Sequence, residues 1–141
     1  MPPYKIPKRV KHRKEFRRVR DRKATKGNYV AFGDYGLQAL DGCWLKSNCI
    51  EAGRIACQHY LKREGKLFIR VFPDKPVSKK PLETRMGKGK ADVDYWAARV
   101  RAGTVLFELA GVSETRAREA FFRVAMKMPI RCRMIGRRVE A

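Results

Sequence analysis

The residues best suited to chemistry in this chain form a run of cations and glycines, Lys79–Lys90, that lies between two apolar segments. Glycine has no Cβ, so a backbone that contains it can come close to a ligand. Each neighbouring lysine adds an ammonium group to the exposed amides. Amide and ammonium donors together suit phosphate oxygens, so the run predicts contact with a polyanion. A solvated surface loop without a ligand is the alternative that the run alone leaves open.

The charge of the whole chain favours the polyanion, because 34 Lys+Arg stand against 14 Asp+Glu and give a net charge of +20. Residues 1–26 carry 12 basic and 2 acidic side chains, and residues 66–91 carry 8 and 2. Hydrophobic residues make up 44% of the 141 residues, which is enough for a folded core. We therefore expect an extended basic RNA-binding arm at 1–26 and a single α+β RNA-binding domain at 27–141, containing a basic loop at 73–92.

Catalytic and metal-binding motifs are missing from the sequence. The run at Lys79–Lys90 lacks the GxxxxGK[ST] spacing of a phosphate-binding loop, since Ala91 follows Lys90. His12 and His59 lie far apart in sequence and neither has an evident nucleophile or acid partner, so we interpret both as structural or RNA-facing. The cysteines have no CxxC spacing and apolar neighbours, which predicts small core residues: Cys43, Cys49, Cys57 and Cys132. The sequence thus predicts a protein that is not an enzyme and has no cofactor and no metal.

Membrane association and export are also not indicated by the sequence. No apolar run approaches the roughly 20 residues of a membrane-spanning helix. The N-terminus has no apolar signal-peptide core, and although it is basic, it lacks the serines typical of an organellar presequence.

Hydrophobic periodicity predicts the element order β-β-α-β-loop-β-β-α-β. The first half should contain strands at 29–32 and 36–40, a helix at 48–63 capped by Ser47 and ended at Gly65, and a strand at 67–72. After the basic loop, a strand at 95–100 should turn at Ala102-Gly103 and pair with a strand at 104–109. In that second strand, Glu108 should face solvent.

The second helix has the clearest pattern. Ser113 should cap it, Pro129 should end it, and a strand should follow over 130–134. Its apolar stripe, which we expect to be buried, consists of Ala117, Ala120, Phe121, Val124, Ala125 and Met128. Two helices on a mostly antiparallel sheet system form an α+β sandwich.

Five segments, in this order, resemble the family of bacterial-type large ribosomal subunit protein sixteen. They are Phe32-Gly33-Asp34-Tyr35-Gly36, Ile50-Glu51-Ala52, Ile69–Pro76, Lys80–Lys90 and Lys127-Met128-Pro129-Ile130. The resemblance extends over about residues 5–138, and it implies an α/β-hammerhead-like sandwich. It also implies a structural constituent of the large ribosomal subunit that binds ribosomal RNA near the peptidyl-transferase centre and helps position aminoacyl-tRNA.

The resemblance further implies which partners and residues to expect. The partners would be large-subunit ribosomal RNA, tRNA and neighbouring ribosomal proteins, with no membrane and no obligate homo-oligomer. The location would be the cytoplasm, in a bacterial-type ribosome rather than an organellar one. The expected tRNA-binding residues are Arg85, Met86, Gly87, Lys88, Gly89 and Lys90. The expected rRNA-binding residues are Lys5, Lys8, Arg9, Lys11, His12, Arg13, Lys14, Arg17, Arg18, Arg20, Arg22, Lys23, Lys75, Lys79 and Lys80.

Two other functions fit parts of the sequence. A free-standing nucleic-acid regulator or chaperone would use the same basic arm. An RNA-modifying enzyme would bind the same polyanion, but it requires a catalytic set that the sequence does not show.

Overall fold

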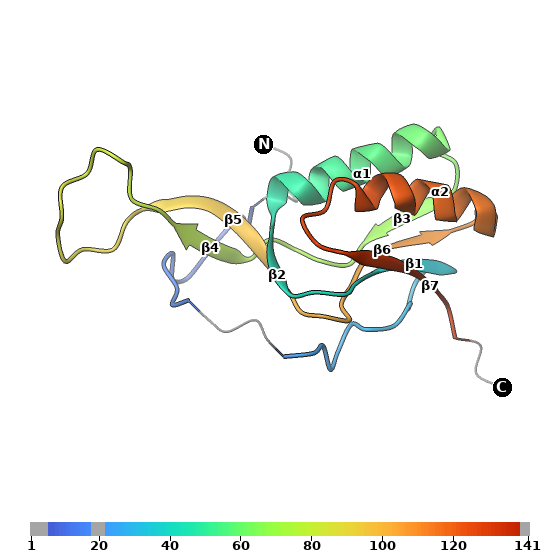
Figure 1. Cartoon of the computed structure of the whole chain (residues 1–141), viewed down its shortest axis with the longest axis horizontal. Coiled ribbons are helices and arrows are strands. Elements are labelled where there is room, and N and C mark those ends of the chain that lie inside the picture. The colour runs from blue at the N-terminus through green and yellow to red at the C-terminus, as the bar shows by residue number, and fades with distance from the viewer. Residues whose placement is uncertain (1–5, 18–21, 139–141) are drawn as a thin grey trace.

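A computed structural model of the chain describes residues 6–17 and 22–138, and this part contains two helices and two antiparallel sheets (Figure 1). The mixed architecture confirms the predicted α+β class. The elements in chain order are β1 (Tyr35–Ala39), β2 (Cys43–Lys46), α1 (Ser47–Leu61), β3 (Lys66–Ile69), β4 (Lys75–Ser78), β5 (Val93–Val100), β6 (Val105–Ala110), α2 (Glu114–Ala125) and β7 (Cys132–Gly136).

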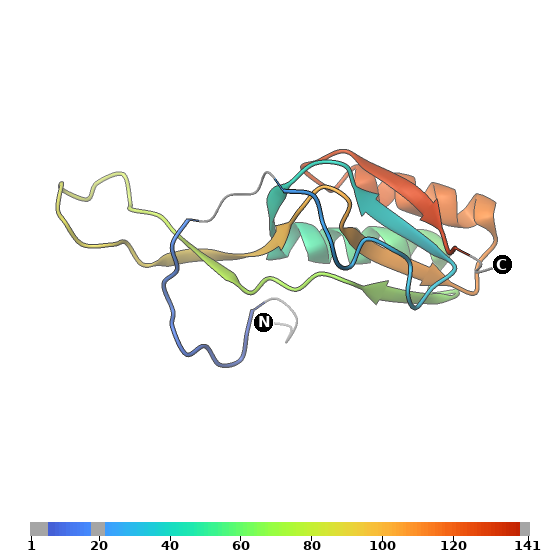
Figure 2. The same ribbon diagram turned by 90° about the horizontal axis from the view of Figure 1, so that it is seen from below.

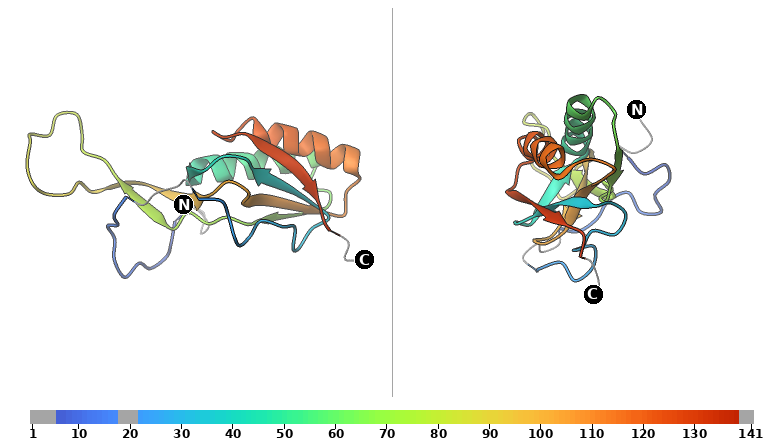
Figure 3. Two further views of the ribbon diagram at one scale, coloured as in Figure 1. Left: turned by 60° about the horizontal axis from the view of Figure 1, so that its bottom comes forward. Right: turned by 90° about the vertical axis from the view of Figure 1, so that its right-hand side faces the viewer.

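The larger sheet has the strand order β3-β6-β1-β7, and both helices lie on one side of it, as the end-on view of Figure 3 shows. β6 is an inner strand, and its residues Val105–Leu109 are all buried. Gly53 brings α1 close to this core, because a Cβ there would lie 2.8 Å from Met128 Cε and 3.0 Å from Phe107 Cζ. The main core therefore lies between the two helices and this sheet.

The smaller sheet has the order β2-β5-β4 and extends to one side of the body. β5 is eight residues long, and it pairs with β2 near its end and with β4 nearer its start. The loop between β4 and β5 forms the far end of the molecule in Figures 1 and 2. The smaller sheet thus carries the basic loop away from the main core.

The prediction that strands 95–100 and 104–109 pair with each other was wrong. β5 belongs to the smaller sheet, whereas β6 pairs with β1 and β3 in the larger one. Gly103 has a φ of +96°, and the turn at 101–104 passes the chain from one sheet to the other. The short strands β2 and β4 were not predicted, and β4 lies inside the stretch that we expected to be loop.

The strand predicted at 29–32 is absent. These residues have no sheet partner, because the backbone amides of Ala31 and Phe32 donate instead to the carboxylate of Glu108. The adjoining prediction at 36–40 is confirmed by β1 to within a residue.

The helix predictions are largely confirmed. α1 begins at Ser47 itself rather than after it, and it ends at Leu61 because Lys62 takes a φ of +51° before Gly65 is reached. α2 starts after Ser113 and buries four residues of its stripe, Ala117, Ala120, Phe121 and Val124. Ala125 is only partly buried, and the helix ends there, before the predicted end at Pro129, so that the buried Met128 lies beyond it. β7 begins two residues later than the predicted last strand, and β3 ends at Ile69, three residues before the predicted end of its strand.

Candidate nucleic-acid interface

The loop between β4 and β5 is the most exposed part of the described chain. Residues 79–90 are all exposed, and the side chains of Leu82 and Met86 make almost no contact with the body. The amide of Lys79 donates to the carbonyl of Asp92 at 3.4 Å, which closes the base of the loop. A loop of this length in a compact domain is usually either functional or disordered.

The glycines of this loop keep its backbone bare. No atom lies within 4 Å of a Cβ built on Gly87 or Gly89, and neither residue takes a positive φ. These glycines are therefore not needed for the geometry of a turn, and their effect is to leave the backbone amides accessible to a ligand. A ligand can approach the amides at 87 and 89 without meeting a side chain.

The cations of the loop fall into two groups. Lys80 Nζ donates to the carbonyl of Gly87 at 3.2 Å, and Lys90 Nζ donates to the carbonyl of Glu15. Within the described ranges 6–17 and 22–138, Arg85 and Lys88 have no hydrogen bond or ion pair through their side chains. These two cations are thus available to an external anion.

A short segment near the N-terminus, Lys14–Arg17, lies against the base of this loop. Lys14 Nζ donates to the carbonyl of Lys90 at 3.1 Å and lies 3.7 Å from the carboxylate of Asp92. The Lys90 ammonium also lies 5.9 Å from the centre of the Phe16 ring. Two basic regions about 75 residues apart in sequence therefore meet at one end of the molecule.

Lys75 is placed differently from the other expected RNA-binding cations. It is 2% exposed, and its ammonium donates to the carbonyl of Phe16 at 3.0 Å. Glu15 lies 3.8 Å from it, and the Trp44 ring centre lies 4.9 Å away. Sequence alone gave no reason to separate Lys75 from its neighbours, but its contacts are those of an internal anchor for the 14–17 segment.

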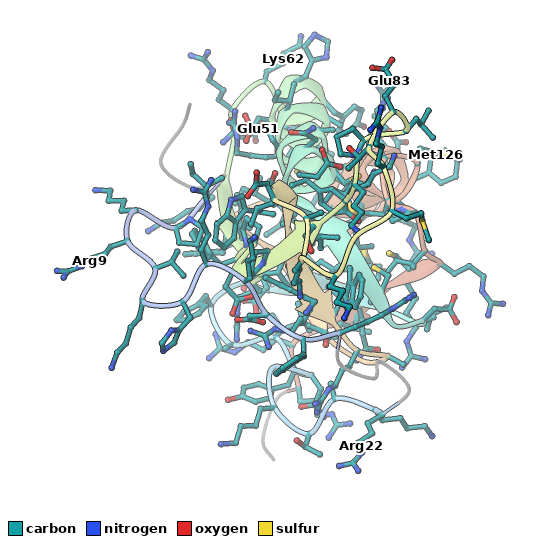
Figure 4. All side chains as sticks on the ribbon, turned by 90° about the vertical axis from the view of Figure 1, so that its left-hand side faces the viewer. Arg9, Arg22, Glu51, Lys62, Glu83 and Met126 are labelled. Carbon is teal, nitrogen blue, oxygen red and sulfur yellow. The ribbon has the colours of Figure 1, made fainter. Side chains whose placement is uncertain are left out.

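The remaining expected cations lie on the surface where the structure describes them. Figure 4 shows Arg9 and Arg22 pointing away from the body. Lys5, Arg18 and Arg20 lie outside the described residues. The exposed members of the set are Lys8, Arg9, Lys11, His12, Arg13, Lys14, Arg17, Arg22, Lys23, Lys79 and Lys80.

The expectation that Glu108 faces solvent was wrong. The residue is 0% exposed, and its carboxylate accepts the amide protons of Ala31, Phe32 and Gly33 at 3.1, 2.6 and 2.9 Å. Arg70 Nη1 pairs with the same carboxylate at 2.6 Å. Burial by itself raises the pKa of this carboxyl, but the amide hydrogen bonds and the Arg70 charge outweigh burial and hold the pKa below its usual 4.5.

One signal in the sequence could have located Glu108. It lies within Val105–Ala110, a nearly continuous apolar run that is typical of an inner strand covered on both faces. A charged residue inside such a run needs a buried partner.

The cysteines and the metal-binding side chains of the described residues were expected to carry no chemistry. All four cysteines are free, and burial raises the pKa of the Cys57 and Cys132 thiols to about 11, so both stay protonated at neutral pH. No group of three or more His, Cys, Asp or Glu side chains in the described ranges is placed to hold a metal ion. Over the same ranges, the helices are too short or too polar to cross a bilayer.

The sequence of this chain is similar to a known protein family and to individual members of known function. The family model described as Ribosomal protein L16p/L10e matches residues 7–135. Large ribosomal subunit protein uL16 of Rhodopirellula baltica is 57% identical over 133 residues, which cover 94% of this chain and 96% of that protein. The protein of the same name from Agathobacter rectalis is 51% identical over 132 residues, with 94% and 91% covered.

Proposed function

The chain belongs to the ribosomal protein L16p/L10e family, and from this membership we infer that it is a structural constituent of the large ribosomal subunit and not an enzyme. Its partners are then ribosomal RNA and other ribosomal proteins. A net charge of +20 on a chain of this size is relieved by such an environment, because RNA phosphates neutralise charges that otherwise repel each other. The family also supports an α/β-hammerhead type for the fold.

The RNA-binding surface of this function consists of the exposed arm cations and the cations at the base of the loop. The contacts of Lys14 and Lys90 support a shared surface, since they join the two regions. Lys75 has a separate part here, which is to hold the 14–17 segment in place from inside. We assign residues 1–26 to an RNA-binding arm and residues 27–141 to one domain on the same grounds.

The tip of the loop has a different task, which is to help position aminoacyl-tRNA near the peptidyl-transferase centre. The observation that carries this assignment is the availability of Arg85 and Lys88 near the tip of a loop that the Lys14–Arg17 segment contacts only at its base. The planar guanidinium of Arg85 can donate two hydrogen bonds to one phosphate or stack on a base, and lysine can do neither. Met86, Gly87, Gly89 and Lys90 complete the surface that faces the tRNA.

The setting that follows is a bacterial-type ribosome in the cytoplasm, where the chain acts as a single copy without a homo-oligomer. A free-standing regulator would behave differently on sedimentation. The ribosomal constituent should remain with large subunits through a high-salt wash, whereas a regulator should appear only in the soluble fraction.

The test of the loop is to assemble large subunits with Arg85→Ala, Lys88→Ala or the control Lys127→Ala, which removes an exposed cation just beyond α2. Arg85→Ala should reduce aminoacyl-tRNA binding more than Lys88→Ala, and Lys127→Ala should leave it unchanged. The thermal stability of the isolated protein should be the same for all three.

The outcomes separate the possible tasks of the loop. Normal assembly with weakened tRNA binding supports the proposal. Failed assembly would make the loop an anchor on ribosomal RNA. Normal assembly and normal peptide-bond formation in a triple alanine variant of Arg85, Lys88 and Lys90 would show that the loop is a solvated surface loop without a ligand.

A further inference from the structure

A pair of stacked phenylalanines lies on the surface of the body, away from the basic loop. The rings of Phe32 and Phe68 have centroids 5.7 Å apart and planes inclined by 28°. The guanidinium carbon of Arg70 lies 4.8 Å from the Phe32 centroid, and the Lys66 ammonium lies 5.2 Å from the Phe68 centroid. Even with these neighbours, Phe32 is 62% exposed as a residue.

The backbone that presents Phe32 is held with unusual firmness for an exposed residue. The buried carboxylate of Glu108 binds the amides of Ala31, Phe32 and Gly33, as described above. A Cβ on Gly33 would lie 2.5 Å from the carbonyl oxygen of Leu109, so only glycine allows the chain to approach β6 this closely. The same carboxylate fixes Arg70 beside the ring.

This arrangement is not explained by packing alone. A loop that only covers the core would turn its largest apolar side chain inward, as Val30 does two residues earlier. Here a fully buried ion holds the backbone while the phenyl ring faces outward. A rigid aromatic surface beside a guanidinium matches the requirements of an unpaired nucleobase, which stacks on both.

The chemistry around the ring favours RNA over an apolar protein surface. Arg70 and Lys66 lie against the two rings. Arg70 also lines a hollow of about 550 Å³, together with Lys26, Phe72 and Arg99. The hollow has the size of a small-ligand site. Its one acidic lining residue, Asp74, is paired with Arg99 at 3.1 Å.

We propose that Phe32, backed by Phe68 and Arg70, is a stacking site for an unpaired base of ribosomal RNA, separate from the arm and the loop. The proposal rests on the proposed function for the identity of the RNA. Figure 2 shows β3 and the segment before β1 at the end of the body that lies away from the loop, so the chain would hold RNA at two separate places.

The first test measures binding of the full chain, over a series of salt concentrations, to large subunits whose resident copy has been removed by a harsher wash than the one used for sedimentation. Phe32→Ala should weaken binding about five- to 150-fold, the equivalent of 1–3 kcal/mol for one stacked base. The slope of log affinity against log salt should not change, because stacking releases no counterions. Phe122→Ala is the matched control, since Phe122 is 63% exposed on α2 and should have no effect.

Two further variants keep the test decisive if Phe32→Ala is unstable. Phe32→Tyr retains an aromatic face and should bind like the unchanged chain. Phe32→Leu covers Phe68 but cannot stack, so it should bind as weakly as Phe32→Ala. Full binding by Phe32→Leu would overturn the stacking site.

A photoreactive phenylalanine analogue, p-benzoylphenylalanine, incorporated at position 32 identifies the neighbour directly. An adduct with ribosomal RNA supports the proposal, and an adduct with a ribosomal protein, or none, overturns it. Failure of the proposed function would look different, because the unchanged chain itself would then not bind the washed subunits.

Discussion

At the scale of single residues, Glu108 connects β6 to residues 31–33, which do not themselves pair with any strand. Its carboxylate replaces a β partner for residues 31–33 by accepting their amide protons, and the bond to Gly33 is buried. Hydrogen bonds to an ionised acceptor are about twice as strong as neutral ones, and three of them converge here. This local exchange explains why a stretch with strand-like residues does not form a strand.

The stability of the fold should therefore depend on the charge of Glu108. Its pKa in the folded chain lies below the usual 4.5, so its stabilising effect is complete above pH 4.5 and is lost as the pH falls through the lower folded value. Glu108→Gln should reduce the free energy of unfolding at pH 7 by about 3–5 kcal/mol, because Arg70 and the amides lose a charged partner. Urea titrations at pH 7 and pH 3 measure both effects.

The matched control is Asp41→Asn. The pKa of Asp41 is also lowered, chiefly by its hydrogen bond from Arg131, but this pair lies on the surface and is screened by water. Asp41→Asn should change stability at pH 7 far less than Glu108→Gln. If both variants unfold at the same urea concentration as the unchanged chain, the Glu108 cluster does not stabilise the fold.

The sequence predicted where the basic regions lie, but it did not predict which of their cations are exposed and which are buried. Arg85, Lys88 and Lys75 all read as cations in one basic region, yet Lys75 is buried against Phe16 and Trp44. The side chains that enclose it come from residues distant in sequence, so no local pattern carries this information. The exposure of the loop was predictable, since the loop has almost nothing to pack.

At the scale of elements, the strongly periodic segments were predicted well. α2 has its apolar stripe at a clear 3.6-residue spacing and needs no distant partner to be recognised. The pairing of β5 and β6 was not predictable in this way. Adjacent strands joined by a turn usually pair, and nothing in the sequence of either strand states that the chain changes sheets at Gly103.

The register of α2 can be tested with two neighbouring phenylalanines. Phe121 is buried in the main core, and Phe122 is exposed on the other side of the helix. Phe121→Ala should reduce the free energy of unfolding by about 3–5 kcal/mol, the usual cost of removing a buried phenyl group. Phe122→Ala should stay within about 0.5 kcal/mol of the unchanged chain. A loss below about 1 kcal/mol for Phe121→Ala would contradict the packing.

At the scale of the whole molecule, the charge pattern and the topology act together. The smaller sheet carries the loop outward, and the 14–17 segment returns to its base and covers Lys75. Composition predicted two basic regions, but their meeting depends on contacts between residues about 75 positions apart. We therefore expect the position of this segment to affect both folding and binding.

Two truncations should separate these effects. Removing residues 1–13 deletes five basic side chains, not counting histidine, but keeps the docked segment, so stability should hold while RNA binding weakens. Each phosphate contact that is lost should reduce the log–log salt slope by about 0.7–0.9. Removing residues 1–17 also deletes Lys14 and Arg17, so it should reduce the slope further. It should also lower the free energy of unfolding by about 1–3 kcal/mol, because the buried Lys75 ammonium loses Phe16 and Glu15.

A substitution in the longer truncation checks this cause. Lys75→Met keeps the length of the side chain and removes its charge, so it should restore part of the lost stability while leaving RNA binding unchanged. Thermal melts and salt-dependent binding to washed large subunits are the measurements. Equal stability of the two truncations would show that Lys75 does not depend on the 14–17 segment, and an unchanged salt slope in both would show that residues 1–13 do not contact phosphates.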